Sequence, residues 1–188
     1  MTARPFLTLC LALAITAGLP AAAVHAADAA PRDGSHDFDF NVGKWRTHIR
    51  RVLDPLSGGT HSVTLDGTVT AHRLWGGPAQ IEEIEADGPG GAHVEGMTLF
   101  LYDPAAGQWS QAFAGAKANA IDTPMVGGFK DGRGELIAAD VVGGRTVLLR
   151  GVWSNFTATS HHFEEDYSAD GGRTWVPAFI ADLTRISD

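Results

Sequence analysis

The chain has 188 residues, and its 14 Lys and Arg against 22 Asp and Glu give a formal net charge of −8 at pH 7. This acidic balance disfavours nucleic acid and anionic membrane surfaces as partners, because both carry negative charge themselves. The single cysteine, Cys10, lies in an apolar N-terminal run, so the rest of the chain can form no disulfide and offers no thiolate chemistry.

Residues 1–26 have the pattern of a secretory signal peptide. Arg4 supplies a positive charge, residues 6–17 form a mainly apolar run, and Val24-His25-Ala26 provides a cleavage pattern. An uncleaved membrane anchor is the alternative, although a membrane span needs about 20 uninterrupted apolar residues. We therefore predict a periplasmic or secreted protein without membrane attachment after cleavage, in which residues 27–35 form a short flexible leader.

Residues 36–188 have a normal single-domain length and are predicted to fold as one all-β domain. Short β-type segments alternate with Gly, Pro, Asp and Asn turn signals, and no long segment has a helical period. The predicted strands are 44–54, 61–74, 80–87, 94–102, 109–115, 125–129, 135–142, 145–154, 161–168 and 175–185. Mostly tight turns favour a single antiparallel up-and-down barrel of about ten strands, because closure removes exposed edges. A two-sheet sandwich is the alternative, but it usually needs longer crossovers.

Hairpin registers predict which residues face the barrel interior. The Gly143-Gly144 pair permits a two-residue turn, because glycine tolerates positive φ. The next connection would place Ser154 opposite Ser160, which makes Arg150 and Glu164 an exposed ion pair contributing under about 1 kcal/mol. A single bulge would reverse these faces. The predicted inward residues on these strands and on the first strand are Val147, Leu149, Gly151, Trp153, His161, Phe163, Glu165, Tyr167, Trp45, Thr47, Ile49 and Arg51.

Gly43-Lys44-Trp45 on the first predicted strand and Arg185 on the last resemble the lipocalin/calycin pattern. The resemblance implies that the tryptophan packs at the closed end of a lipocalin-like barrel, with the arginine lying across it. A guanidinium over an indole gains cation–π energy, and its N–H groups can hold the incoming N-terminal chain.

Much of residues 36–187 is also similar to an uncharacterised bacterial family of lipocalin-like domains, often exported. The similar segments are 36–51, 99–109 (LFLYDPAAGQW), 126–135 (VGGFKDGRGE), 150–154 and 167–175 (YSADGGRTW). That family brings no established activity, substrate or catalytic residue, so the resemblance implies a fold and no chemistry.

Residues 168–175 (SADGGRTW) resemble an Asp box, S-x-D-x-G-x-T-W, a hairpin that sialidases and other propellers repeat. The motif occurs once here, in a chain far too short for a propeller. We predict a structural role, in which Asp170 accepts hydrogen bonds from turn amides and Trp175 packs over the turn. A glycosidase function is the weaker alternative.

The residues give little support for metal, haem or nucleophilic chemistry. His161 and His162 are adjacent and so point to opposite faces of a strand, and the other histidines lack ligand spacing. Haem binding of the nitrobindin type would want an axial histidine on a late strand, and residues 175–185 contain none. The mature chain has no cysteine, no Gly-x-Ser-x-Gly elbow and no evident Ser/His/Asp set. We predict neither a metal nor a cofactor.

The predicted barrel interior is the candidate site. Its candidate ligand-binding residues are Arg51, Glu83, Trp109, Phe113, Trp153, Phe163, Tyr167 and Phe179. An apolar pocket with a few polar groups predicts binding of a small, largely apolar ligand. One alternative is an isomerase, cyclase or dehydratase in which Glu165 or His161 is the acid or base, tuned by burial. The other is a filled barrel with a structural or interaction role.

Overall fold

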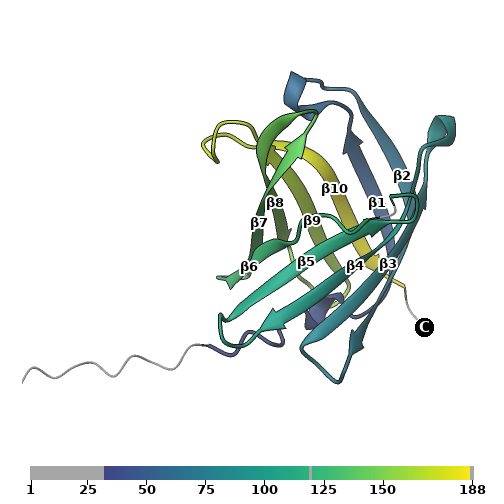
Figure 1. Cartoon of the computed structure of the whole chain (residues 1–188). Coiled ribbons are helices and arrows are strands. Elements are labelled where there is room, and N and C mark those ends of the chain that lie inside the picture. The colour runs from purple at the N-terminus through teal and green to yellow at the C-terminus, as the bar shows by residue number, and fades with distance from the viewer. Residues whose placement is uncertain (1–31, 119, 187–188) are drawn as a thin grey trace, which may run out of the picture. The chain divides into compact units, whose positions relative to one another are not determined.

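The computed structural model describes residues 32–118 and 120–186, which form a closed barrel of ten antiparallel strands (Figure 1). The strands are β1 (Gly43–Val52), β2 (Ser62–Leu74), β3 (Ala79–Asp87), β4 (His93–Asp103), β5 (Gln108–Gly115), β6 (Met125–Lys130), β7 (Arg133–Val142), β8 (Arg145–Ser154), β9 (Ser160–Ser168) and β10 (Val176–Arg185). The predicted barrel class is confirmed, while the predicted signal peptide lies outside the described residues. Within them, no helix is long and apolar enough to cross a membrane.

The barrel is an up-and-down meander, because each strand pairs with the next and β1 closes the sheet against β10. The Gly143-Gly144 turn has φ of 58° and 79°, and it places Val142 opposite Arg145 as predicted. The shortest seam lies between β5 and β6, which share three residue pairs.

β8 and β9 pair two residues away from the predicted register, since Ser154 lies opposite His162 and not opposite Ser160. The connection between the strands is longer than expected, because Thr157 closes its own turn onto Ser160 and Phe156 packs against Phe40. A shift of two residues preserves the inward face, so only the cross-strand partners change.

The changed register corrects the predicted Arg150–Glu164 pair. Arg150 lies opposite Asp166, whose Oδ2 accepts hydrogen bonds from Arg150 Nη2 at 2.6 Å and Nε at 3.0 Å. The Trp175 ring covers the guanidinium at 4.3 Å. Asp166 is only 1% exposed, so this ion pair is buried on the outer side of the barrel instead of being exposed.

The hairpin between β9 and β10 has the structural role predicted for its Asp-box sequence. Asp170 Oδ1 accepts hydrogen bonds from the backbone N–H of Arg173 and Thr174, and Oδ2 accepts one from the Thr174 hydroxyl. These bonds lower the pKa of Asp170 to about 2, with the Thr174 amide as the largest cause. The turn thereby holds Trp175 in place over Arg150.

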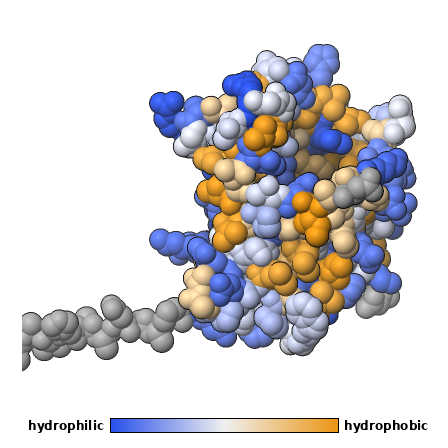
Figure 2. All heavy atoms as spheres, in the orientation of Figure 1, coloured by the Kyte–Doolittle hydropathy of each residue, from blue (hydrophilic) through white to orange (hydrophobic). Residues whose placement is uncertain are grey.

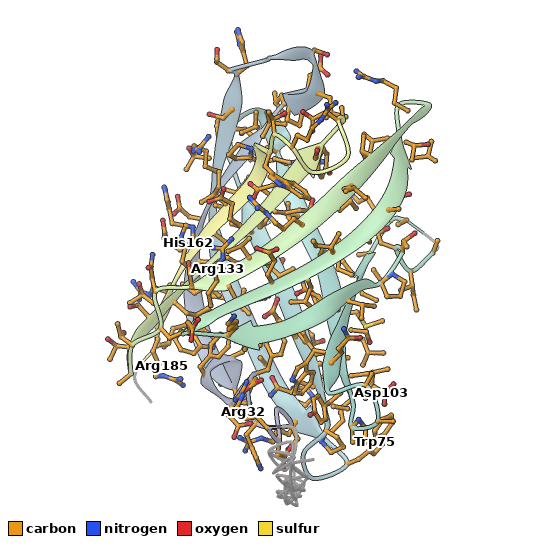
Figure 3. All side chains as sticks on the ribbon, turned by 90° about the vertical axis from the view of Figure 1, so that its left-hand side faces the viewer. Arg32, Trp75, Asp103, Arg133, His162 and Arg185 are labelled. Atoms are coloured by element: carbon orange, nitrogen blue, oxygen red, sulfur yellow. The ribbon has the colours of Figure 1, made fainter. Side chains whose placement is uncertain are left out.

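The lower end of the barrel in Figure 1 is closed by the predicted Trp45–Arg185 pair. The guanidinium lies 4.0 Å above the Trp45 ring, and it donates to the carbonyl oxygens of Val42 at 3.1 Å and Phe40 at 3.3 Å. Gly43 has a φ of 130°, and a Cβ there would collide with the guanidinium, which explains the glycine two residues before the tryptophan. Figure 3 shows Arg185 and Arg32 at this same end.

The segment before β1 crosses the lower end and plugs it. Its short 3-10 helix, η1 (Asp39–Asn41), follows Phe38, which is fully buried. The Phe38 ring lies 4.6 Å from Phe100, 5.0 Å from Trp109 and 5.5 Å from Trp153, measured between centroids. Aromatic side chains therefore fill the lower half of the interior.

The last residues of the predicted flexible leader are held against the barrel. The Gly34 N–H donates to the Tyr102 hydroxyl at 3.0 Å, and the Gly34 carbonyl accepts from Trp109 Nε1 at 2.9 Å. Arg32 forms a bidentate ion pair with Asp37. Contacts with the barrel are thus already made four residues before the predicted boundary at residue 36.

Candidate functional site

Above the plug, the barrel contains a cavity of about 530 Å³. Its wall comes from inward residues of the strands. Its mouth comes from residues 53–56, which include the first two residues of the short helix η2 (Pro55–Ser57), and from Asp122. Figure 2 shows the upper end of the barrel hollowed, with apolar residues visible inside. Cavities of this size hold small molecules in other proteins, and the filled-barrel alternative is wrong for this half of the interior.

Four of the five predicted Trp and Phe residues line the cavity: Phe113, Trp153, Phe163 and Phe179. Trp109 does not, although it points inward and is 1% exposed. Trp109 is the second residue of β5 and therefore lies at the plugged end, packed on Phe38. The inward direction is predicted correctly, but the alternation does not show how deep the plug reaches into the barrel.

The mouth brings together three predicted polar residues, Arg51, Glu165 and Tyr167, and adds Asp122. Arg51 is exposed, as its position near the upper end of β1 requires. Burial raises the pKa of Glu165, while the nearby Tyr167 hydroxyl and the Arg51 charge act in the opposite direction. Burial and the Glu165 carboxylate raise the pKa of Tyr167, so the phenol stays protonated. Arg51 is thus close enough for its charge to act on Glu165.

Glu83 lies outside the barrel, contrary to prediction, and its neighbour Glu82 lines the cavity. The strand sequence AQIEEIEAD places apolar and acidic residues on both faces, so alternation alone leaves the parity ambiguous. The number of acidic residues on each face of the strand could have resolved this parity. The face of Glu83 also carries Glu85 and Asp87, whereas Glu82 is the only acidic residue on the other face.

Four polar side chains form the floor of the cavity, and the sequence reading missed them as site residues. They are Thr47 on β1, Glu82 on β3, Thr98 on β4 and Gln111 on β5, each at most 8% exposed. Glu82 Oε2 accepts a hydrogen bond from Asn41 Nδ2 at 2.8 Å, and Gln111 Oε1 accepts one from Trp153 Nε1 at 2.9 Å. Burial raises the pKa of Glu82 from 4.5 to about 7, against the opposing effect of Asn41 and Thr98.

His161 points inward as predicted but does not reach the cavity. Its ring lies in the sealed lower half, with centroids 4.3 Å from Trp45, 5.1 Å from Phe40 and 5.7 Å from Trp153. Burial, then the charges of Arg185 and His162, lower its pKa to about 3, so the imidazole is neutral. The structure therefore separates His161 from Glu165. In residues 32–118 and 120–186, no cluster of three or more His, Cys, Asp or Glu could hold a metal ion.

No protein-family model matches this chain, and no curated protein matches it significantly. Among solved structures, the S-type phycobiliprotein lyase CPES from Guillardia theta is 9% identical over 81% of this chain and 92% of its own, with a TM-score of 0.55. EF1p2_mFAP2b bound to DFHBI is 9% identical over 81% of this chain and 99% of its own, with a TM-score of 0.45. A de novo designed fluorescence-activating β-barrel is 13% identical over 82% and 99%, with a TM-score of 0.42. The likeness to the lyase shows the fold alone.

Proposed function

We propose that this chain is an exported barrel protein that binds a small, largely apolar ligand in its cavity. The cavity itself carries the proposal, because its volume of about 530 Å³ is bounded mainly by aliphatic and aromatic side chains with polar groups at the floor and mouth. Export rests on the signal-peptide pattern of residues 1–26. Membership of the uncharacterised lipocalin-like family that the sequence resembles is part of the same proposal.

Native mass spectrometry of the protein from its own cell envelope, before and after denaturation, tests this function. We expect the mass of a chain beginning at Ala27, together with an extra mass that leaves on unfolding. A chain that keeps residues 1–26 would contradict export.

A cavity-filling variant tests where a ligand binds. Ala181 lines the cavity from β10, whereas Thr184 lies on the outer face of the same strand. Ala181→Phe should weaken binding of the apolar dye Nile red at least about tenfold, because the added ring occupies the cavity. Thr184→Phe should leave dye binding unchanged, and Ala178→Phe provides a second filling variant. Unchanged dye binding in both folded filling variants, or a wild-type chain that binds no dye and carries no extra mass, would contradict the proposal.

Acid–base catalysis in the same cavity is the second candidate function. It is favoured by Glu165, a cavity-lining carboxyl whose pKa is raised by burial. His161 does not line the cavity and drops out of this hypothesis. Glu165→Gln should abolish any turnover measured with the wild-type protein, and full activity in this variant would remove the assignment.

A further inference from the structure

Glu82 at the floor of the cavity is a buried carboxylate without a cationic partner. In the part of the chain that the structure describes, no Lys, Arg or His forms an ion pair with it, and its hydrogen bonds come from the neutral side chains of Asn41 and Thr98. Removing a carboxylate from water is costly unless a cation or several donors compensate it. The barrel itself therefore supplies no cation that compensates the Glu82 carboxylate, and a ligand can do so.

Arg51, the cation that lines this cavity, is too far along β1 to pair with Glu82. The register places Glu82 opposite Ala71 on β2, and Ala71 lies opposite Gly43 at the start of β1. Arg51 is eight residues further along the same strand, or about 26 Å at 3.3 Å per residue. It acts instead on Glu165 and Tyr167 at the mouth.

The floor offers further hydrogen-bond acceptors beside Glu82. Thr98 on β4 is the cross-strand partner of Glu82, and it lines the cavity at 5% exposure with its hydroxyl oxygen. Asn41 Oδ1, on the side chain that donates to Glu82, is buried without a partner among the described residues. A group with several N–H donors would satisfy a carboxylate and a hydroxyl oxygen together.

The charged residues that line the cavity also favour a cationic ligand. Its lining contains one basic residue, Arg51, and four acidic ones, Asp54, Glu82, Asp122 and Glu165. The chain as a whole carries a formal charge of −8. Such a field favours entry of a cation and opposes entry of an anion.

We propose that the cavity takes an amphiphilic amine head-first, with its ammonium group bound to Glu82 at the floor, beside the Thr98 hydroxyl. The apolar remainder lies along Val69, Ile84, Phe163 and Phe179 toward the mouth. This inference rests on the proposed ligand-binding function, and it adds the chemical class of the ligand and the direction in which it enters.

Three probes with the same alkyl chain, decylamine, decanol and decanoate, test the inference by displacement of Nile red at pH 8. Decylamine should bind at least about tenfold more tightly than decanol, because a buried carboxylate gains from a charged donor, and decanoate should bind most weakly. Glu82→Gln should reduce decylamine to the affinity of decanol while decanol itself is unchanged. Glu83→Gln, one residue away on the outer face, should behave as wild type.

The outcomes separate the two proposals. Equal binding of all three probes, or an amine preference that survives Glu82→Gln, overturns the amine inference and leaves the binding function standing. Failure of every probe and of Nile red to bind the wild-type protein overturns both. Decanol binding by Glu82→Gln shows that the variant is folded and that its cavity is intact.

A pH series gives a second readout. An alkyl ammonium with a pKa of about 10 stays charged from pH 5.5 to 8.5, so its affinity should rise with pH as Glu82 ionises. Arg51, Asp54, Asp122, Glu165 and Tyr167 also face the cavity, and their contribution is measured in Glu82→Gln. An equal pH dependence in wild type and Glu82→Gln contradicts the inference.

Discussion

His161 is buried among aromatic rings, and both of its ring nitrogens lack hydrogen-bond partners in the described structure. Its pKa of about 3 in the folded state is far below the usual 6.5. The unfolded chain therefore takes up a proton below pH 6.5 that the folded chain does not. The stability contributed by the neutral imidazole is complete above pH 6.5 and is lost progressively as the pH falls.

His161→Phe should remove this acid sensitivity, because a phenyl ring can pack against Phe40, Trp45 and Trp153 without titrating. Between pH 6.5 and pH 5 the wild type should lose about 2 kcal/mol of its free energy of unfolding through His161, from 1.5 pH units at 1.36 kcal/mol each, and the variant should not lose it. Chemical denaturation at pH 7 and pH 5 measures the effect, with the exposed His72→Phe as control. An equal loss of stability between these pH values in wild type and His161→Phe would contradict the assignment.

Glu82 has the opposite dependence, since its folded pKa of about 7 lies above the usual 4.5. The folded state keeps a proton that the unfolded state releases, so stability is greatest below pH 4.5 and falls as the pH rises to about 7. Glu82→Gln should gain about 3 kcal/mol relative to wild type between pH 4.5 and 8, and Glu83→Gln should gain nothing. Denaturation of ligand-free protein across this pH range measures the gain. An equal pH dependence of stability in wild type and Glu82→Gln would refute it.

At the scale of elements, the hairpin after β9 protects a buried ion pair. Asp166 receives two hydrogen bonds from Arg150, and Trp175 covers the pair from outside. The tight bonding around Asp170 holds the covering ring in position. A motif that propellers repeat thus serves here to close one side of the barrel wall.

Arg150→Met should destabilise the protein by about 3 kcal/mol, because Asp166 remains buried without its cation. The double variant Arg150→Met, Asp166→Leu should recover most of this loss, since no buried charge is left. Thermal denaturation of both variants measures the difference. A double variant as unstable as Arg150→Met would show that Asp166 has another essential role.

At the scale of the molecule, one end of the barrel is closed and the other is open. The lower end is plugged by Phe38 and closed by Arg185 over Trp45, while the upper end keeps the cavity open. Arg185 joins the last strand to the segment before β1 through Phe40 and Val42. The plug therefore sets the depth of the cavity and supplies Asn41, which orients Glu82.

Arg185→Lys should lower the free energy of unfolding by about 2 kcal/mol, because an ammonium cannot reach both carbonyls and stack on the indole. The exposed Arg133→Lys should change stability by less than about 0.5 kcal/mol. Chemical denaturation compares the two variants. Equal stabilities would contradict the role of Arg185 in closing the lower end of the barrel.

The sequence by itself determined the strand order, barrel closure and closed end, because alternation and turn chemistry are local and Trp45 and Arg185 mark the first and last strands. It also placed Phe113, Phe163 and Phe179 facing inward. Only the tertiary structure decided that Trp109 belongs to the plug and that Arg150 pairs with Asp166. These outcomes depend on strand register and on how far the N-terminal segment enters the barrel. Both are set by packing between residues distant in the chain, which no local pattern encodes.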